Sequence, residues 1–126
     1  MSIPLWVHPI AQLALVTLLL LTFRLGSRLE RKWHVRLAWV SAIGIIAFAI
    51  VGLAAHALAG FTDLALPHGW LGALIAALLV RQIWLGRQLQ RGDEKERMRH
   101  RWNARFILIL TAVQVLSGML YAGAVL

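Results

Sequence analysis

Residues 34–59 read HVRLAWVSAIGIIAFAIVGLAAHALA, and Arg36 is the only Lys, Arg, Asp or Glu among them. About 20 apolar residues in a helix cross the ~30 Å hydrocarbon core of a bilayer, so this stretch is long enough to span a membrane. Three further apolar stretches, residues 8–27, 68–89 and 102–125, predict three more spans. The expected fold class is therefore all-α: residues 1–126 form a single transmembrane domain, an antiparallel four-helix bundle.

The composition of the chain is that of a membrane protein. Hydrophobic residues make up 60% of the 126 residues and charged residues 14%, whereas soluble domains are about half apolar and about a quarter charged. The chain has no cysteine, which excludes disulfides, thiolate metal sites, iron–sulfur clusters and cysteine nucleophiles. No Asp, Glu or Lys lies within the expected spans, so neither a hydrolase site nor an ion pathway is indicated.

The positive charge lies on one side of the expected membrane. All 13 lysines and arginines surround the first and third connections, within residues 24–36 and 81–105. The positive-inside rule places these segments in the cytoplasm and both termini outside, as in a multi-pass protein of the bacterial inner membrane. Lipid phosphates are the expected partners of this charge, and nucleic acid is not. Arg81 interrupts the third stretch, and its side chain is expected to extend toward the nearer interface.

Each expected span begins with a histidine that has a tryptophan within two residues, and these are His8, His34, His68 and His100. Because the spans alternate in direction, His8 and His68 are expected at the outer face and His34 and His100 at the inner face. A bis-histidine b-type haem needs imidazoles on opposite sides of the porphyrin, with backbone positions about 12–13 Å apart. Diagonal helices of a square bundle lie about 11–14 Å apart. The diagonals therefore predict one haem between His34 and His100 and another between His8 and His68.

A fifth histidine, His56, leaves the outer pair open. It lies on nearly the same helix face as His34, about 40° away, and about 33 Å farther along the axis. His68 therefore pairs with either His56 or His8, and His56 is slightly preferred because His8 is close to a chain end. A role without any ligand is the alternative, because histidine and tryptophan both suit a membrane interface.

Further polar residues accompany the histidines. Arg36 and Arg101 lie close in sequence to His34 and His100, and their guanidinium groups are suited to bind haem propionates. The positive-inside rule also accounts for both arginines. Gln114 and Ser117 share a helix face in the fourth stretch, where an interhelical hydrogen bond is expected in preference to a quinone or water site.

Four segments read WVHPIAQ, KWHVRLAWVSAIG, LPHGWLGAL and RHRWNARFILILTAVQVLSG, at residues 6–12, 32–44, 66–74 and 99–118. With them the chain resembles the cytochrome b561 and ferric-reductase-like transmembrane superfamily, and among its members the small bacterial four-span proteins grouped as DUF4079. The resemblance implies haem b bound between helices and electron transfer across the membrane. It also implies that His34, His56, His68 and His100 are the axial, iron-binding ligands. The chain has two spans fewer than the six-span eukaryotic members.

The leading functional hypothesis is a membrane b-type cytochrome that carries electrons across or within the bilayer through one or two bis-histidine haem b groups. Its expected partners are a quinol or a redox partner protein. It would act as an electron-transfer protein or redox subunit rather than as a stand-alone enzyme. The alternative is a cofactor-free structural subunit or assembly factor of a larger membrane protein complex, which abundant small helix-packing residues also suit.

Reporter fusions test the expected sidedness. A reporter fused after Val125 is expected outside the cytoplasm and one inserted within residues 91–96 inside it, because basic residues flank only the second position. Paired alkaline phosphatase and fluorescent-protein fusions at both positions measure this. A cytoplasmic reporter after Val125 would contradict the orientation and the assignment of His34 and His100 to the inner face.

Overall fold

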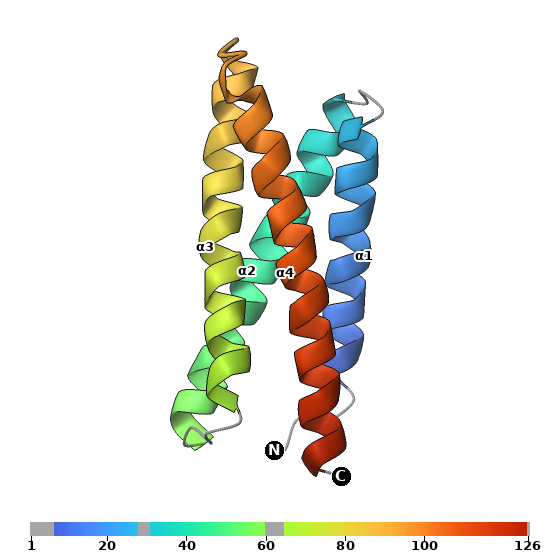
Figure 1. Ribbon diagram of the computed structural model, residues 1–126, viewed down its shortest axis with the longest axis vertical. Helices are drawn as coiled ribbons and strands as arrows, with labels where there is room; N and C mark the ends of the chain where they lie inside the picture. The colour runs from blue at the N-terminus through green and yellow to red at the C-terminus, as the bar shows by residue number, and fades with distance from the viewer. Residues whose placement is uncertain (1–6, 28–30, 60–64, 126) are drawn as a thin grey trace.

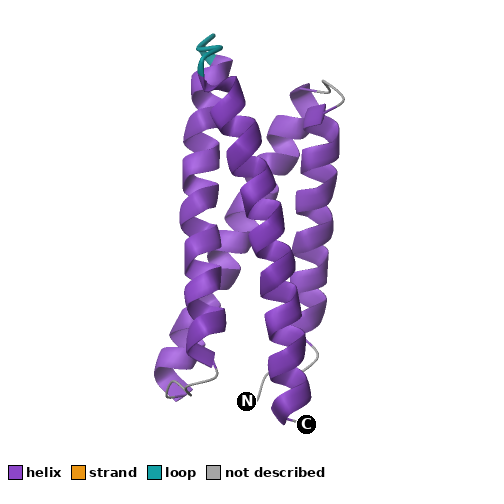
Figure 2. Ribbon diagram, viewed as in Figure 1, coloured by secondary structure: helices purple, strands orange, loops and turns teal. Residues whose placement is uncertain are grey.

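The described part of the chain is almost entirely helical. The computed structural model describes residues 7–27, 31–59 and 65–125. They form helices α1 (Val7–Ser27), α2 (Arg31–Ala59), α3 (Ala65–Gln90) and α4 (Glu96–Val125), shown in Figures 1 and 2. The expected all-α class with four helices is confirmed.

Three of the helices are long and apolar enough to cross a membrane. The segments concerned are Arg31–Ala54 of α2, Pro67–Gln90 of α3 and Glu96–Leu120 of α4. In α1 the corresponding apolar segment, Ile10–Gly26, is shorter, and its role as a fourth span stays a prediction. Many large apolar side chains on these helices are exposed, as is expected of surfaces that contact lipid. Helices suit such surroundings because they satisfy their own backbone hydrogen bonds.

The connection between α3 and α4 is a tight turn at Gly92. Gly92 has a φ of 92°, in the left-handed region that glycine adopts without steric cost. The Asp93 N–H donates to the Gln88 carbonyl and the Gly92 N–H to the Leu89 carbonyl, both at 3.1 Å. This pair of bonds is the Schellman motif that ends many helices. It lets α4 return directly alongside α3.

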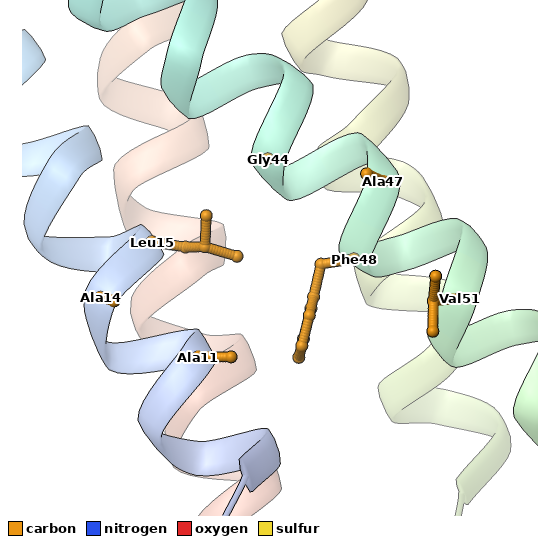
Figure 3. A pocket seen from close by; sticks show the side chains of 7 residues that line it. All are labelled: Ala11, Ala14, Leu15, Gly44, Ala47, Phe48 and Val51. Atoms are coloured by element: carbon orange, nitrogen blue, oxygen red, sulfur yellow. The ribbon is translucent and has the colours of Figure 1, made fainter.

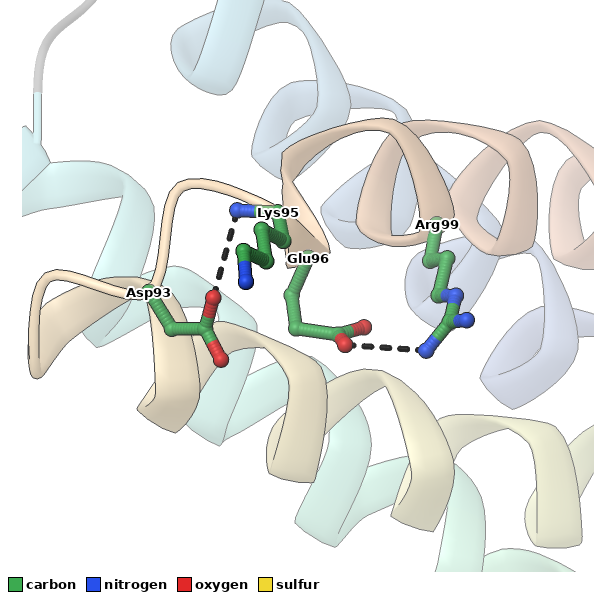
Figure 4. A network of polar contacts seen from close by, with 4 residues as sticks. All are labelled: Asp93, Lys95, Glu96 and Arg99. Carbon is green, nitrogen blue, oxygen red and sulfur yellow. Dashed lines mark hydrogen bonds and ion pairs between the residues drawn. The ribbon is translucent and has the colours of Figure 1, made fainter.

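Helix α4 begins earlier than the span expected from residue 102. The Asp93 carboxylate accepts the Lys95 N–H at 3.2 Å, and Glu96 in the first turn accepts a hydrogen bond from Arg99 at 2.9 Å (Figure 4). Carboxylates near a helix N-terminus are stabilised by the helix dipole. Apolarity therefore predicts the bilayer-crossing segment, whereas capping interactions decide where the helix begins.

The four helices are arranged so that two pairs face each other diagonally. Backbone contacts join α1 to α2, α2 to α3, α3 to α4 and α4 to α1, while among the described residues the pairs α1–α3 and α2–α4 make none. One end of the molecule in Figure 1 holds the start of α1 and the end of α4, together with the end of α2 and the start of α3. The starts of α2 and α4 lie at the opposite end.

Close packing of small and branched side chains holds the bundle together. Leu19, Ile75, Leu79 and Ile107 form a buried cluster. A Cβ atom on Gly44 of α2 would lie 2.8 Å from Cδ2 of Leu15 on α1, so glycine permits this close approach. An apolar groove continues between the same two helices, lined by Ala11, Ala14, Leu15, Gly44, Ala47, Phe48 and Val51 (Figure 3).

Shortening one buried and one exposed side chain of α4 should distinguish a residue that packs in the core from a residue on the outer surface of the bundle. Ile107 is 1% exposed and Ile109, on the same helix, is 60% exposed. We expect Ile107→Ala to lower the free energy of unfolding by about 2–4 kcal/mol, because it leaves a cavity among packed side chains. Ile109→Ala should change it by less than about 0.5 kcal/mol. Thermal unfolding in detergent measures both, and equal effects would contradict the described core.

Candidate functional site

Two histidines from diagonal helices meet at one end of the bundle. His34 lies near the start of α2 and His100 near the start of α4, and both are half-buried. Their ring centroids are 6.2 Å apart and the ring planes are inclined by 78°. The structure thus brings together the two histidines that the sequence analysis assigned to the inner face.

The distance between these two ring centroids can be compared with the distance expected when two imidazoles bind the same metal ion. Imidazole nitrogens bind first-row metals at about 2.0–2.1 Å, so an ion midway between two rings separates their centroids by about 6.3 Å. The observed 6.2 Å agrees with this value. Since both planes of such a pair contain the ligand–metal axis, a large interplanar angle is compatible with it.

The hydrogen bonds of His34 determine which ring nitrogen is available. Nδ1 of His34 is 2.7 Å from the backbone carbonyl oxygen of Thr22 on α1. A carbonyl oxygen only accepts, so Nδ1 carries the hydrogen, and in the neutral imidazole the lone pair is on Nε2. A metal-binding histidine is commonly oriented by such a second-nitrogen bond to a carbonyl.

Two glycines on the other diagonal lie against the histidine rings. A Cβ atom on Gly26 of α1 would lie 2.7 Å from Cε1 and 2.8 Å from Nδ1 of His34. On Gly86 of α3 it would lie 3.5 Å from Cε1 of His100. The histidine rings fill the space that a side chain would take at these positions, so glycine lets α1 lie against His34 and α3 against His100.

His100 also belongs to a polar network within α3 and α4 that the sequence analysis did not identify. The Gln82 amide nitrogen is 3.2 Å from both Nδ1 and Nε2 of His100, and the Gln82 oxygen accepts from Asn103 at 2.8 Å. Asn103 is 3% exposed and accepts from Arg81. Arg81 was expected only to extend to the interface. The signal that could have found this network is the occurrence of three polar side chains inside two apolar spans.

The remaining histidines are differently placed. On α3, His68 lies with Nδ1 3.0 Å from Oγ of Ser117 and Nε2 3.0 Å from the amide nitrogen of Gln114, both on α4. The expected role of Gln114 and Ser117 in interhelical hydrogen bonding is therefore confirmed. The side chains of His8 and His56 lie outside the described residues. The outer histidine pair stays a prediction.

The hydrogen bonds around His68 have a defined direction. Ser117 donates its hydroxyl hydrogen to the Gln114 carbonyl at 2.9 Å, so its oxygen accepts from Nδ1 of His68. Nε2 of His68 then accepts from the Gln114 amide. In this arrangement the His68 lone pair is engaged within the bundle, in contrast to that of His34.

The two arginines proposed for propionates lie at the surface. The Arg36 guanidinium lies over the Trp33 ring of its own helix, 5.4 Å from the centroid, and Arg101 is exposed. A role for either in binding a cofactor stays a prediction.

The two histidines suit a metal cofactor that itself supplies most of the ligands of its metal ion. Among the described residues, no three His, Cys, Asp or Glu side chains gather in a position to hold a metal ion. A closed zinc site takes four protein ligands, whereas a haem iron needs only one or two axial side chains. His34 and His100 supply this number of side chains, although the His100 ring also lies 3.2 Å from the Gln82 amide nitrogen.

Comparisons of the chain with protein-family models, with curated proteins and with solved structures give no match. The family resemblance of the sequence stays a prediction.

Alanine at the two glycines should distinguish a close approach from ordinary contact. Gly86→Ala should be neutral or stabilise by up to about 1 kcal/mol, because alanine is the better helix former. Gly26→Ala should instead destabilise by about 1–3 kcal/mol, because the methyl group overlaps the His34 ring. Thermal unfolding of both variants in detergent measures this. A stabilised Gly26→Ala variant would show that the His34 ring does not lie against α1.

Proposed function

We propose that this protein is a membrane b-type cytochrome in which His34 and His100 are the axial ligands of one low-spin haem b. The single observation that carries the proposal is the 6.2 Å separation of the two imidazole rings across the α2–α4 diagonal. It agrees with the separation that one metal ion between two imidazoles requires.

The protein environment of the pair supports the same conclusion. The Thr22 carbonyl accepts from Nδ1 of His34 and so places the lone pair of the neutral ring on Nε2. The hydroxyl of Thr22 donates to the Leu18 carbonyl at 2.8 Å and lies 3.1 Å from Oγ of Ser41, so the segment that supplies this carbonyl is itself held from α2. Gly26 and Gly86 keep the flanking helices free of side chains beside the rings.

A bound haem would supply one-electron redox chemistry, while the protein supplies axial ligation, burial and electrostatic surroundings. The residues of this chain would then have separate roles. His34 and His100 would hold the iron, Thr22 would orient the His34 ring, and the apolar spans would exclude water from the pair. Electrons would pass between a quinol or redox partner protein on one side and an acceptor on the other.

The proposed orientation is an antiparallel bundle in the bacterial inner membrane, with both termini outside. The starts of α2 and α4 lie at the same end of the molecule (Figure 1), and all the lysines and arginines of the sequence fall within residues 24–36 and 81–105. The positive-inside rule then puts the His34–His100 pair near the cytoplasmic face. A second haem, between His68 and either His8 or His56, is proposed only as the outer counterpart.

Haem content tests the proposal directly. Purified protein from haem-replete cells should show sharp reduced α and β bands and should release haem into acidified organic solvent, because the chain has no cysteine for covalent attachment. His34→Ala and His100→Ala should each remove the same inner haem, since each takes away one of its two axial ligands. The haem-to-protein ratio and the reduced spectrum measure the loss.

Two controls keep this test decisive. Thermal unfolding shows whether a variant without haem is still folded, and His34→Met replaces one haem ligand by another, so it should retain haem with an altered spectrum. Full haem content with unchanged spectra in both alanine variants would disprove the inner site. A folded, colourless wild-type protein would favour a structural subunit or assembly factor of a larger complex.

A further inference from the structure

Helix α2 carries an exposed stripe of side chains at the end of the bundle where it starts. Residues spaced i, i+4, i+7 and i+11 along a helix fall within about 60° of one another around its axis. On α2 these positions are Lys32, Arg36, Trp39 and Ile43, and all four side chains are exposed. From the end of the bundle toward its middle, the α2 stripe therefore presents two cations, one indole and one aliphatic side chain.

Helix α3, which ends where α2 starts (Figure 1), carries a stripe of the same order. The same spacing, followed backward along the chain, gives Arg91, Arg87, Trp84 and Val80, all of them exposed. Arg91 directly follows the last residue of α3, but its N–H donates to the Arg87 carbonyl at 3.1 Å and so continues the helical course. The α3 stripe thus also begins with two cations and continues with an indole and an aliphatic side chain.

The two stripes meet at a contact between an arginine and a tryptophan. The guanidinium carbon of Arg87 on α3 lies 5.3 Å from the ring centroid of Trp39 on α2. Arg36 and Arg105 also lie over tryptophan rings, but these belong to their own helices. Arg36 and Arg91 each lie about one helical turn from the Arg87–Trp39 contact, toward the end of the bundle. The two stripes therefore form one continuous surface.

The four cations of this surface have no acidic partner among the described residues. The ion pairs within the described part of the chain join Arg97 to Glu94 and Arg99 to Glu96, outside both stripes. Like charges four residues apart on a helix repel each other, and each stripe contains one such pair. An anion supplied from outside the chain would relieve this repulsion on both helices.

We propose that the α2 and α3 stripes together bind one phospholipid whose head group carries two phosphates. Each helix offers two cations one turn apart, which suits one phosphate per helix. Trp39 and Trp84 lie next to the cations, as tryptophan does at the level of lipid head groups, and Ile43 and Val80 continue toward the acyl chains. Basic sites between membrane helices are known to hold such head groups. The surface is separate from the His34–His100 pair and does not require haem.

A neutral substitution on the α3 stripe tests the site. Arg87→Gln should weaken the binding of tetraoleoyl cardiolipin, which has two phosphates, about fivefold, the effect of about 1 kcal/mol for one basic residue near an anionic surface. Arg91→Gln should weaken it to the same extent while leaving the Arg87–Trp39 contact in place. Native mass spectrometry of the detergent-solubilised protein, titrated with the lipid, measures Kd for each variant.

Arg105→Gln is the matched control. It removes the same charge, and Arg105 also lies over a tryptophan ring, 5.3 Å from the centroid, but on α4 alone. Its Kd for cardiolipin should stay within about twofold of the wild-type value. Equal weakening in Arg105→Gln and Arg87→Gln would show a general attraction between charges and would overturn the site. Unchanged Kd values in folded Arg87→Gln and Arg91→Gln would overturn it as well.

A second lipid tests the number of phosphates. Dioleoyl phosphatidylglycerol has one phosphate, so it should bind to the wild-type protein about fivefold more weakly than cardiolipin, because one pair of cations is left without a partner. Equal affinity for the two lipids would overturn the two-phosphate site. The haem content of the same preparation is measured separately, and its outcome bears only on the proposed function.

Discussion

Polar side chains inside apolar helices have to find their partners within the protein, because a hydrocarbon surrounding offers none. The arrangement of this bundle follows from that constraint. Thr22 and Ser41 bond across α1 and α2, His34 bonds to α1, and Asn103 and Gln82 join α3 to α4. The apolar side chains that pack beside them would fit several rotations of each helix. The hydrogen bonds select one rotation, and that rotation turns His34 and His100 toward each other.

The two ends of the bundle use histidine in different ways. At one end Nδ1 of His34 donates to the Thr22 carbonyl, which places the lone pair on Nε2, and the ring of a second histidine lies 6.2 Å away. At the other end Gln114 and Ser117 of α4 engage both ring nitrogens of His68, as expected of a histidine that joins two helices. A histidine with one oriented nitrogen and one free nitrogen is prepared for a ligand. The contrast holds for His34 alone, because the His100 ring lies 3.2 Å from the Gln82 amide nitrogen.

Small residues have a second role besides helix packing. Gly44 lets α1 and α2 approach closely, whereas Gly26 and Gly86 lie beside the histidine rings. Since Gly26 and Gly86 belong to α1 and α3, the histidine pair and the glycine pair occupy the two diagonals of one bundle end. The glycines thus let the histidine rings pack directly against α1 and α3.

The amino-acid sequence by itself determined the helical class, three segments long and apolar enough to cross a membrane and the closeness of His34 to His100, because apolar runs and residue positions are properties of the chain alone. It did not indicate the early start of α4 at Glu96, which depends on capping by Asp93, nor the closeness of Gly26 to His34. The sequence also did not indicate the hydrogen-bond network of Arg81, Gln82 and Asn103. Which hydrogen-bond partner a polar side chain finds depends on the rotation of each helix about its axis and on its neighbour, and only the tertiary structure decides both.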